Sequence, residues 1–335
     1  MVARRCDRRV LEARPAGLPE LRSRHLGTGR SGRADEKGRA LLEAALTEGI
    51  TIRQIEQELG RLRQAAAAPG NAPNLRTSVM THIAWVPERW VDAATDTLAG
   101  MGERHPSRTI LLFPRPDEPR DELDGEVDLR CFVRAGEQGQ VCSEVISLQL
   151  CGPRANAPAS VAVPLLVPDL PVFLRWRGEP DFDGPALPQL TGVADRLVLD
   201  ADEWSDCDAT FARLPEIFDR ITVSDIAWAK LQPWREACAA LWPGGIAEAD
   251  SLRVAGPRGE TLLLWGWLQA RLERRLELEH EPAGEVELVA IDGDEVPQPR
   301  ATRASASDLL SDQLEIFSRD RIYEEAVRAL EAVPA

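Results

Sequence analysis

The stretch Asn156–Pro180 reads NAPASVAVPLLVPDLPVFLRWRGEP and is the most apolar segment of the chain. Pro164, Pro168, Pro171 and Asp169 interrupt it, which argues against a membrane span because bilayer hydrocarbon penalises a charge. The segment is therefore expected to lie in a protein core. We predict that Asn156 caps a short helix with Pro158 in its first turn, and that Pro171–Trp176 forms a strand buried on both faces.

Charged residues follow at the far end of this strand, where open α/β sheets usually expose their working surface. Arg175, Arg177 and Glu179 are the charged residues there. Arginine is favoured at the centre of protein interfaces because its planar guanidinium pairs well with carboxylates. We therefore expect these three side chains to be exposed and to contribute to a partner contact.

The rest of the chain predicts a mixed α/β fold in two domains, since 335 residues exceed what one hydrophobic core usually organises. The first domain, residues 50–220, should hold a mixed sheet; residues 221–335 should hold linking helices and a smaller α/β domain. The elements expected in the first domain, besides the central strand, are helices 51–67, 87–101 and 186–192 and strands 76–86, 108–113, 126–134, 141–150 and 196–199. Those expected in the second are strands 247–254, 274–280 and 285–291 and helices 261–272 and 319–332.

A tryptophan-rich segment links the two domains. Apolar residues recur at helical spacing across residues 227–241, and Pro233 either kinks this helix or begins a second one. Core packing is the first interpretation of such a stripe, but clustered tryptophans also mark partner surfaces. Trp228, Trp234 and Arg235 are therefore further candidates for partner binding.

Charge and composition limit the partners. A net charge of -15 argues against nucleic acid, because phosphate binding needs a basic face. Residues 1–34 are the exception, with nine arginines against three acidic residues. We expect them to be a disordered extension or the product of a wrongly assigned start codon; a targeting sequence or a basic arm is the alternative. Membrane partners are not expected, and the cytoplasm is the expected compartment.

The sequence predicts neither a metal site nor a cofactor. It has six cysteines without a CxxC pair and only four histidines, which argues against zinc. It also lacks the GxSxG, HExxH and P-loop motifs, and no GxGxxG follows a strand. In a reducing compartment we expect free thiols, including Cys131, Cys142 and Cys151, which fall in strand-like runs.

One short constellation could bind an anion. His105, Ser107 and Arg108 place an imidazole, a hydroxyl and a guanidinium at a helix-to-strand junction, which could hold a phosphoryl group. The plainer interpretation is that Pro106 breaks the chain, Ser107 satisfies backbone groups and Arg108 pairs with a neighbouring acid. This interpretation is preferred.

Several short motifs occur in an order that resembles a known family. They are HPSR at 105–108, CSE at 142–144, PLLVPDLP at 164–171, WRG at 176–178, ADR at 194–196 and WAKLQPWRE at 228–236. Together they resemble the glucose-6-phosphate dehydrogenase assembly protein family, OpcA, over about residues 50–333.

The resemblance implies a cytoplasmic bacterial protein that binds glucose-6-phosphate dehydrogenase, favours its active oligomer and raises its activity without catalysis of its own. The alternative is an enzyme or a sensor that recognises a sugar phosphate through His105–Arg108. The Arg-rich leader lies outside the resemblance, and the resemblance does not identify contact residues.

Overall fold

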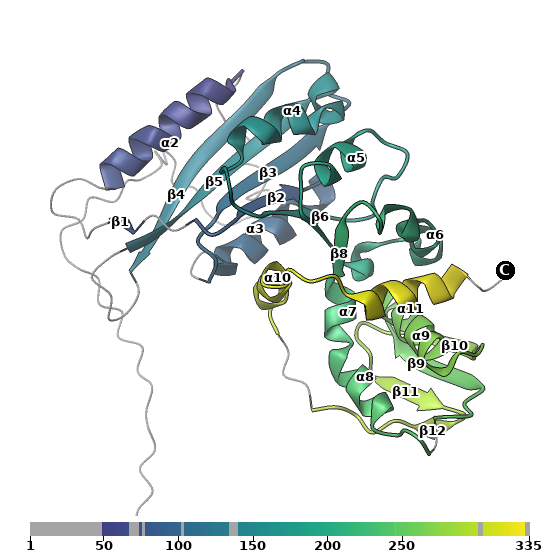
Figure 1. Cartoon of the computed structure of the whole chain (residues 1–335). Coiled ribbons are helices and arrows are strands. Elements are labelled where there is room, and N and C mark those ends of the chain that lie inside the picture. Colours follow the sequence, from purple (N-terminus) through teal and green to yellow (C-terminus); the bar gives the residue numbers. More distant parts are fainter. Residues whose placement is uncertain are drawn as a thin grey trace, which may run out of the picture.

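The structure is a computed structural model that describes residues 49–66, 74–75, 78–101, 104–133, 140–244, 246–300 and 304–331. The predicted leader, residues 1–34, lies outside these ranges. The described chain forms two sheets, a large one built mainly from the first half and a small one built from the second half (Figure 1). Within the described ranges, no helix is both long and apolar enough to cross a membrane.

The large sheet has eight strands, in the order β1-β5-β3-β2-β6-β7-β8, with β4 antiparallel on the other edge of β5. Every other pairing in it is parallel. Counted from β2, the run β5-β3-β2-β6-β7-β8 has the 3-2-1-4-5-6 order of a doubly wound sheet. The predicted mixed α/β class is confirmed. The strands are β1 (Asn74–Leu75), β2 (Thr81–Trp85), β3 (Arg108–Arg115), β4 (Leu123–Val133), β5 (Gln140–Cys151), β6 (Val172–Trp176), β7 (Arg196–Leu199) and β8 (Thr222–Asp225).

The apolar stretch forms the centre of this sheet, as predicted. Strand β6 is paired on both edges, with β2 and β7, and all five of its residues are buried. The side chain of Leu174 packs into the main core, whereas Phe173 packs into a second cluster on the opposite face. The preceding helix α4 (Pro158–Ala162) begins after Ala157, so the prediction of Asn156 as its cap is wrong.

Helices cover both faces of the sheet (Figure 1). Buried residues of α2 (Ile52–Ala66), α4, α5 (Ala186–Thr191) and α6 (Cys207–Arg213) share the main core with Leu174. On the other face, α3 (Val91–Met101) packs over β2 and β3. Helix α10 (Ala306–Leu314) packs against α3, although it comes from near the end of the chain.

The small sheet has the order β10-β9-β11-β12, and β10 runs parallel to β9. Its strands are β9 (Ser251–Gly256), β10 (Glu277–Pro282), β11 (Leu288–Ile291) and β12 (Asp294–Glu295). The long helix α9 (Arg258–Leu272) packs against the terminal helix α11 (Arg321–Glu331). The two helices approach closely at Gly266, where an added Cβ would collide with the backbone of Ala326.

The tryptophan-rich segment consists of two short helices, α7 (Ile226–Lys230) and α8 (Gln232–Ala239). Pro233 lies in the first turn of α8, where its missing N–H costs nothing, so it begins a second helix. Trp228 and Trp234 both lie in the main core, which confirms the core-packing interpretation.

Several elements in and around the large sheet were not predicted, among them β1, α6, β8 and α10. Strand β8 has only four residues and lies beyond residue 220, and α10 returns to this sheet after the small one is complete. The division of the chain at residue 220 stays a prediction. Residues from beyond it nevertheless belong to the first half of the structure, because β8 is a strand of the large sheet and α10 packs on α3.

The cysteines divide into a disulfide and free thiols. Cys131 and Cys142 lie directly opposite each other on β4 and β5 and form a disulfide, so the prediction of free thiols is wrong for this pair. The sequence spacing did not reveal the strand register that brings them together. Cys151, Cys207 and Cys238 are buried free thiols, as predicted.

A truncation at Leu174 tests the central strand. Leu174 is fully buried, so Leu174→Ala should lower the free energy of unfolding by about 2 to 5 kcal/mol in urea titrations. Val163→Ala is the control, because Val163 is 47% exposed and should change stability by less than about 0.5 kcal/mol. Equal effects of the two substitutions would contradict the burial of β6.

Candidate functional site

Two buried arginines share one carboxylate at the carboxyl end of β6. Glu203, in the single turn η4 (Ala201–Glu203) after β7, accepts hydrogen bonds of 2.6 Å from Arg175 Nη2 and from Arg177 Nη1. Arg175 is 1% exposed and Arg177 is 8% exposed. Two cations against one anion leave a positive excess in a low-dielectric interior, where losing the carboxylate would be costly.

This arrangement corrects the expectation that the strand-end charges are exposed anchors. Arg175 and Arg177 point to the face that α3 covers, where Arg177 donates a 2.8 Å hydrogen bond to Thr97 Oγ1. Glu179 is half-buried and accepts hydrogen bonds from the backbone N–H and the hydroxyl of Ser205. All three strand-end charges bind groups of this chain. They are enclosed because β7, the turn after it and α3 surround the end of β6.

The second set of candidate contact residues is also interior. Trp228 and Trp234 are 5% and 7% exposed, so neither is the exposed anchor that the partner hypothesis requires. Arg235 is half-buried and stacks over the ring of Trp228, with its guanidinium carbon 3.5 Å from the ring centre. Helices α7 and α8 turn this side of the segment inward.

A second charged cluster lies where the two sheets meet. Lys230 Nζ is 2.7 Å from Asp202 and 3.6 Å from Asp200. Burial acts to lower the pKa of Lys230, but Asp200 and Asp202 outweigh it and the pKa is raised. Glu260, on α9, lies beside Asp202, and burial together with that carboxylate raises the pKa of Glu260. The protonated form of the Glu260 carboxyl is therefore favoured beside Asp202.

Asp225 forms another connection between the sheet and the C-terminal helices. Its Oδ1 accepts hydrogen bonds from the backbone N–H groups of Ala201 and Ala227, and its Oδ2 accepts one from the hydroxyl of Tyr323 on α11. Burial raises the pKa of Asp225 to about 7, and the nearby Asp200 adds to the shift. The carboxyl ends of β7 and β8 are thus filled by groups of this chain.

The point where the strand order reverses, between β2 and β6, has no phosphate cradle of the usual kind. Dinucleotide-binding sheets place glycines at the first strand-to-helix turn. This chain has Pro87–Trp90 there, and Glu88 forms a 2.9 Å ion pair with Arg115. The rings of Trp85 and Trp176 stack 5.2 Å apart at the ends of the two strands. A carboxylate would repel a phosphate, and packed indoles fill the space between the strand ends, so this position is unsuited to a phosphate site.

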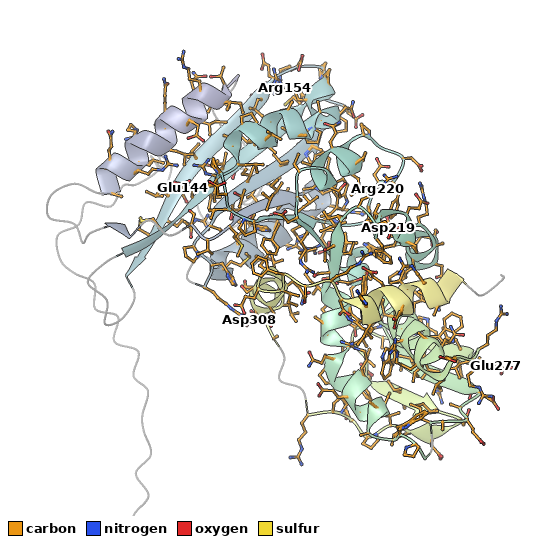
Figure 2. All side chains as sticks on the ribbon, viewed as in Figure 1. Glu144, Arg154, Asp219, Arg220, Glu277 and Asp308 are labelled. Atoms are coloured by element: carbon orange, nitrogen blue, oxygen red, sulfur yellow. A yellow bond between two sulfur atoms is a disulfide. The ribbon has the colours of Figure 1, made fainter. Side chains whose placement is uncertain are left out.

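The candidate anion site at the helix-to-strand junction is not assembled. Arg108 binds Glu144 and Glu56 at 2.8 and 3.0 Å, so carboxylates of this chain already neutralise it. Figure 2 shows Glu144 on β5 within the large sheet. His105 Nε2 lies 3.6 Å from the carboxylate of Glu315, just past the end of α10, and Ser107 Oγ lies 3.3 Å from Thr109 Oγ1. These contacts favour the plainer interpretation, in which Arg108 pairs with a neighbouring acid.

The surface of the described chain offers other features. A cavity of about 400 Å³ opens between β7, β8, α7 and the segment that joins α10 to α11. The most exposed large apolar side chains are Phe317, 68% exposed in that joining segment, and Trp242, 60% exposed after α8. No group of three or more His, Cys, Asp or Glu side chains in the described ranges is placed to hold a metal ion.

Sequence reasoning missed the residues that fill the carboxyl edge of the large sheet and connect it to the second half of the chain. Asp200, Asp202 and Glu203 directly follow a buried strand, and acids at that position are a usable signal for a charged sheet edge. Tyr323 is the single tyrosine of the chain and is fully buried. Its pairing with Asp225, 98 residues earlier, had no local signal.

These features define a class of protein: a doubly wound α/β domain joined by its own ion pairs to a small α/β domain. The profile described as "Glucose-6-phosphate dehydrogenase subunit N-terminal domain" matches residues 99–216, and that of the C-terminal domain matches residues 221–327. The two matches cover most of the described chain in the expected order. The chain belongs to the OpcA family, as its motifs predicted.

Three cyanobacterial relatives carry the name "Putative OxPP cycle protein OpcA". The protein of Synechococcus elongatus is 26% identical over 179 residues, which cover 50% of this chain and 40% of the relative. That of Nostoc punctiforme is 25% identical over 180 residues, covering 51% and 38%. That of Synechocystis is 21% identical over 235 residues, covering 67% and 48%. The chain thus spans less than half the length of these relatives.

A solved structure from Magnetospirillum magnetotacticum, titled a putative oxidoreductase, matches with a TM-score of 0.37 and 13% identity over 77% of this chain and all of that one. A likeness this low bears on neither fold nor function.

The proton held by Glu260 predicts a pH-dependent stability. The pKa of Glu260 is raised above its ordinary 4.5, so its contribution to stability is complete below that pH and is lost as the pH rises toward the folded-state value. Glu260→Gln removes this loss. We expect the stability of the variant to exceed that of the wild type by a margin that grows from about pH 5 to about pH 8.

Urea unfolding at several pH values measures this margin. Glu248→Gln is the matched control, because Glu248 is exposed and should leave the pH profile unchanged. A profile for Glu260→Gln that runs parallel to the wild type would show that Glu260 does not hold the proton.

Proposed function

We propose that this chain is a non-catalytic assembly factor that binds glucose-6-phosphate dehydrogenase in the cytoplasm, promotes its active oligomer and raises its activity. By raising this activity, the chain would support the oxidative pentose phosphate pathway and its supply of NADPH. The observation that carries the proposal is the pair of dehydrogenase-subunit profile matches, one over each half of the chain. The self-paired charges at the sheet edge support it, since Arg175, Arg177 and Lys230 bind carboxylates of this chain there.

The alternative of a sugar-phosphate enzyme or sensor acting through His105–Arg108 has less support. Such a site needs Arg108 to be free for the phosphate, and Glu144 and Glu56 already bind it. Displacing two carboxylates from a buried guanidinium would cost several kcal/mol, on the order of what breaking a buried ion pair costs.

An activator must bind the active state of its partner more tightly than the inactive one. A difference of about 1 to 3 kcal/mol would give a several-fold to hundredfold effect. The contact must use exposed side chains, which excludes the buried Arg175, Arg177, Trp228 and Trp234 as direct anchors in this conformation. Trp242 is the strongest remaining candidate from the tryptophan-rich segment, because exposed tryptophans are enriched among interface hot spots.

The direct test titrates the purified full chain into glucose-6-phosphate dehydrogenase of the same organism. We expect a saturable rise in the rate of NADPH formation, together with a shift of the dehydrogenase to a larger species in size-exclusion chromatography. The chain alone should not turn over the substrate. Absence of both the rate change and a complex across the titration would reject the proposed function.

A substitution at Trp242 tests the contact surface. If Trp242 is an anchor, Trp242→Ala should raise the half-activating concentration about thirtyfold, equivalent to about 2 kcal/mol. Its thermal midpoint should stay at the wild-type value, because the side chain is 60% exposed. Val163→Ser, an exposed apolar position on the other half of the chain, is the control and should activate normally. Normal activation by Trp242→Ala would place the contact elsewhere.

A further inference from the structure

We propose that the cavity of about 400 Å³ between β7, β8 and the segment 315–320, here called the strap, binds a small organic anion through its phosphate or carboxylate group. The binding residue is Arg196. This site is independent of the proposed contact with the dehydrogenase.

Arg196 is a buried cation that has no ion-pair partner in the part of the chain that the structure describes. It begins β7, is 2% exposed and lines the cavity. Its guanidinium donates hydrogen bonds to the hydroxyl of Ser224 on β8 and to the backbone carbonyl of Ser318 in the strap, and both acceptors are neutral. Among the described residues, no carboxylate lies within ion-pair distance of it, in contrast to Arg108, Arg175 and Arg177. Its remaining N–H groups are available to a ligand.

The charges around the cavity leave this guanidinium incompletely compensated. Burial lowers the pKa of Arg196, and Asp320 is the carboxylate that opposes the shift. Asp320 also acts on a second desolvated guanidinium, that of Arg235, whose pKa burial lowers to about 10. One carboxylate thus serves two cations that have lost hydration. A bound anion would supply the negative charge that this guanidinium lacks and would offset the cost of its burial.

The acids that line the cavity are already engaged. Asp320 accepts hydrogen bonds from the indole N–H of Trp228, at 2.8 Å, and from the backbone N–H of Tyr323, at 3.0 Å. Asp225 accepts from the Tyr323 hydroxyl, and burial raises its pKa to about 7, so it carries only part of a charge near neutral pH. Both acids oppose an anion less than free carboxylates would.

The walls indicate the size and kind of ligand. The volume lies in the range of small-molecule sites, which are about 300 to 1,000 Å³. Trp228 and Ile322 supply apolar wall, and Arg321 lies exposed at the cavity without an ion-pair partner in the described chain. A planar guanidinium fork and an apolar wall in the lining suit a metabolite-sized organic molecule with one phosphate or carboxylate group.

The test measures binding of two probes, inorganic phosphate and citrate, to the full chain by isothermal titration calorimetry at constant ionic strength. We expect saturable binding of at least one probe at millimolar or lower concentration, with one site per chain. Arg196→Met should weaken this binding at least tenfold. Arg258→Met is the matched control, because Arg258 is an arginine paired with Asp208 away from the cavity, and it should bind the probes as the wild type does.

Stability separates a ligand site from a structural role. Removing a buried cation that has only neutral acceptors relieves a desolvation cost, so Arg196→Met should unfold at or above the wild-type temperature without ligand. The wild type should gain thermal stability on adding the probe, and Arg196→Met should not. If Arg196→Met does not fold, binding of the two probes is measured with Arg321→Gln instead. This substitution removes an exposed charge at the cavity and should weaken probe binding several-fold.

Three outcomes would overturn the proposal. They are an absence of saturable binding of either probe, equal binding by wild type and Arg196→Met, and equal weakening by the Arg258→Met control. If Arg196→Met instead weakens the complex with the dehydrogenase while neither probe binds the chain, the cavity takes an acidic side chain of that partner and the small-molecule site is rejected.

Discussion

The sharing of Glu203 by Arg175 and Arg177 is the interaction on which the rest of the structure depends. It holds the carboxyl end of β6, the turn after β7 and, through Thr97, helix α3 in one arrangement. Two guanidinium groups on one buried carboxylate leave little freedom, because any movement that exposes one of them to apolar surroundings without its partner is costly. The centre of the large sheet is therefore fixed from its charged end as well as from its apolar core.

The same principle joins the two halves of the chain. Lys230 with the acids of the β7 edge, Glu260 on α9, and the bond between Asp225 and Tyr323 all cross from the large sheet to elements of the second half. Helix α10 packs on α3 and α11 packs on α9, so the two C-terminal helices contact both the large sheet's helices and the smaller half of the chain (Figure 1). In Figure 2, Asp219 and Arg220 lie near this junction. Several buried polar links in series favour one relative position of the two sheets.

This arrangement bears on how the chain could act in its proposed role. The carboxyl edge of a doubly wound sheet is where ligands usually bind. Here much of that edge is filled by ion pairs of the chain itself, and the cavity lies beside them, between Arg196 on β7, the end of β8 and the strap. Exposed aromatic side chains such as Trp242 and Phe317 are suited to binding another protein, because they bury a large apolar area in an interface. That fits the role proposed from the family, while the chain covers less than half the length of its curated relatives.

The sequence by itself determined the local elements and the class of fold. The apolar run into Trp176, the helical spacing around Leu59 and the proline at 158 act over a few residues, so their consequences can be read directly. The family motifs were equally local. Only the tertiary structure decided which charges are exposed, because Arg175 and Arg177 look like surface residues until Glu203, some 26 residues away, is placed beside them. The same holds for the disulfide and for Tyr323, whose partners are set by strand register and helix packing rather than by neighbours in the chain.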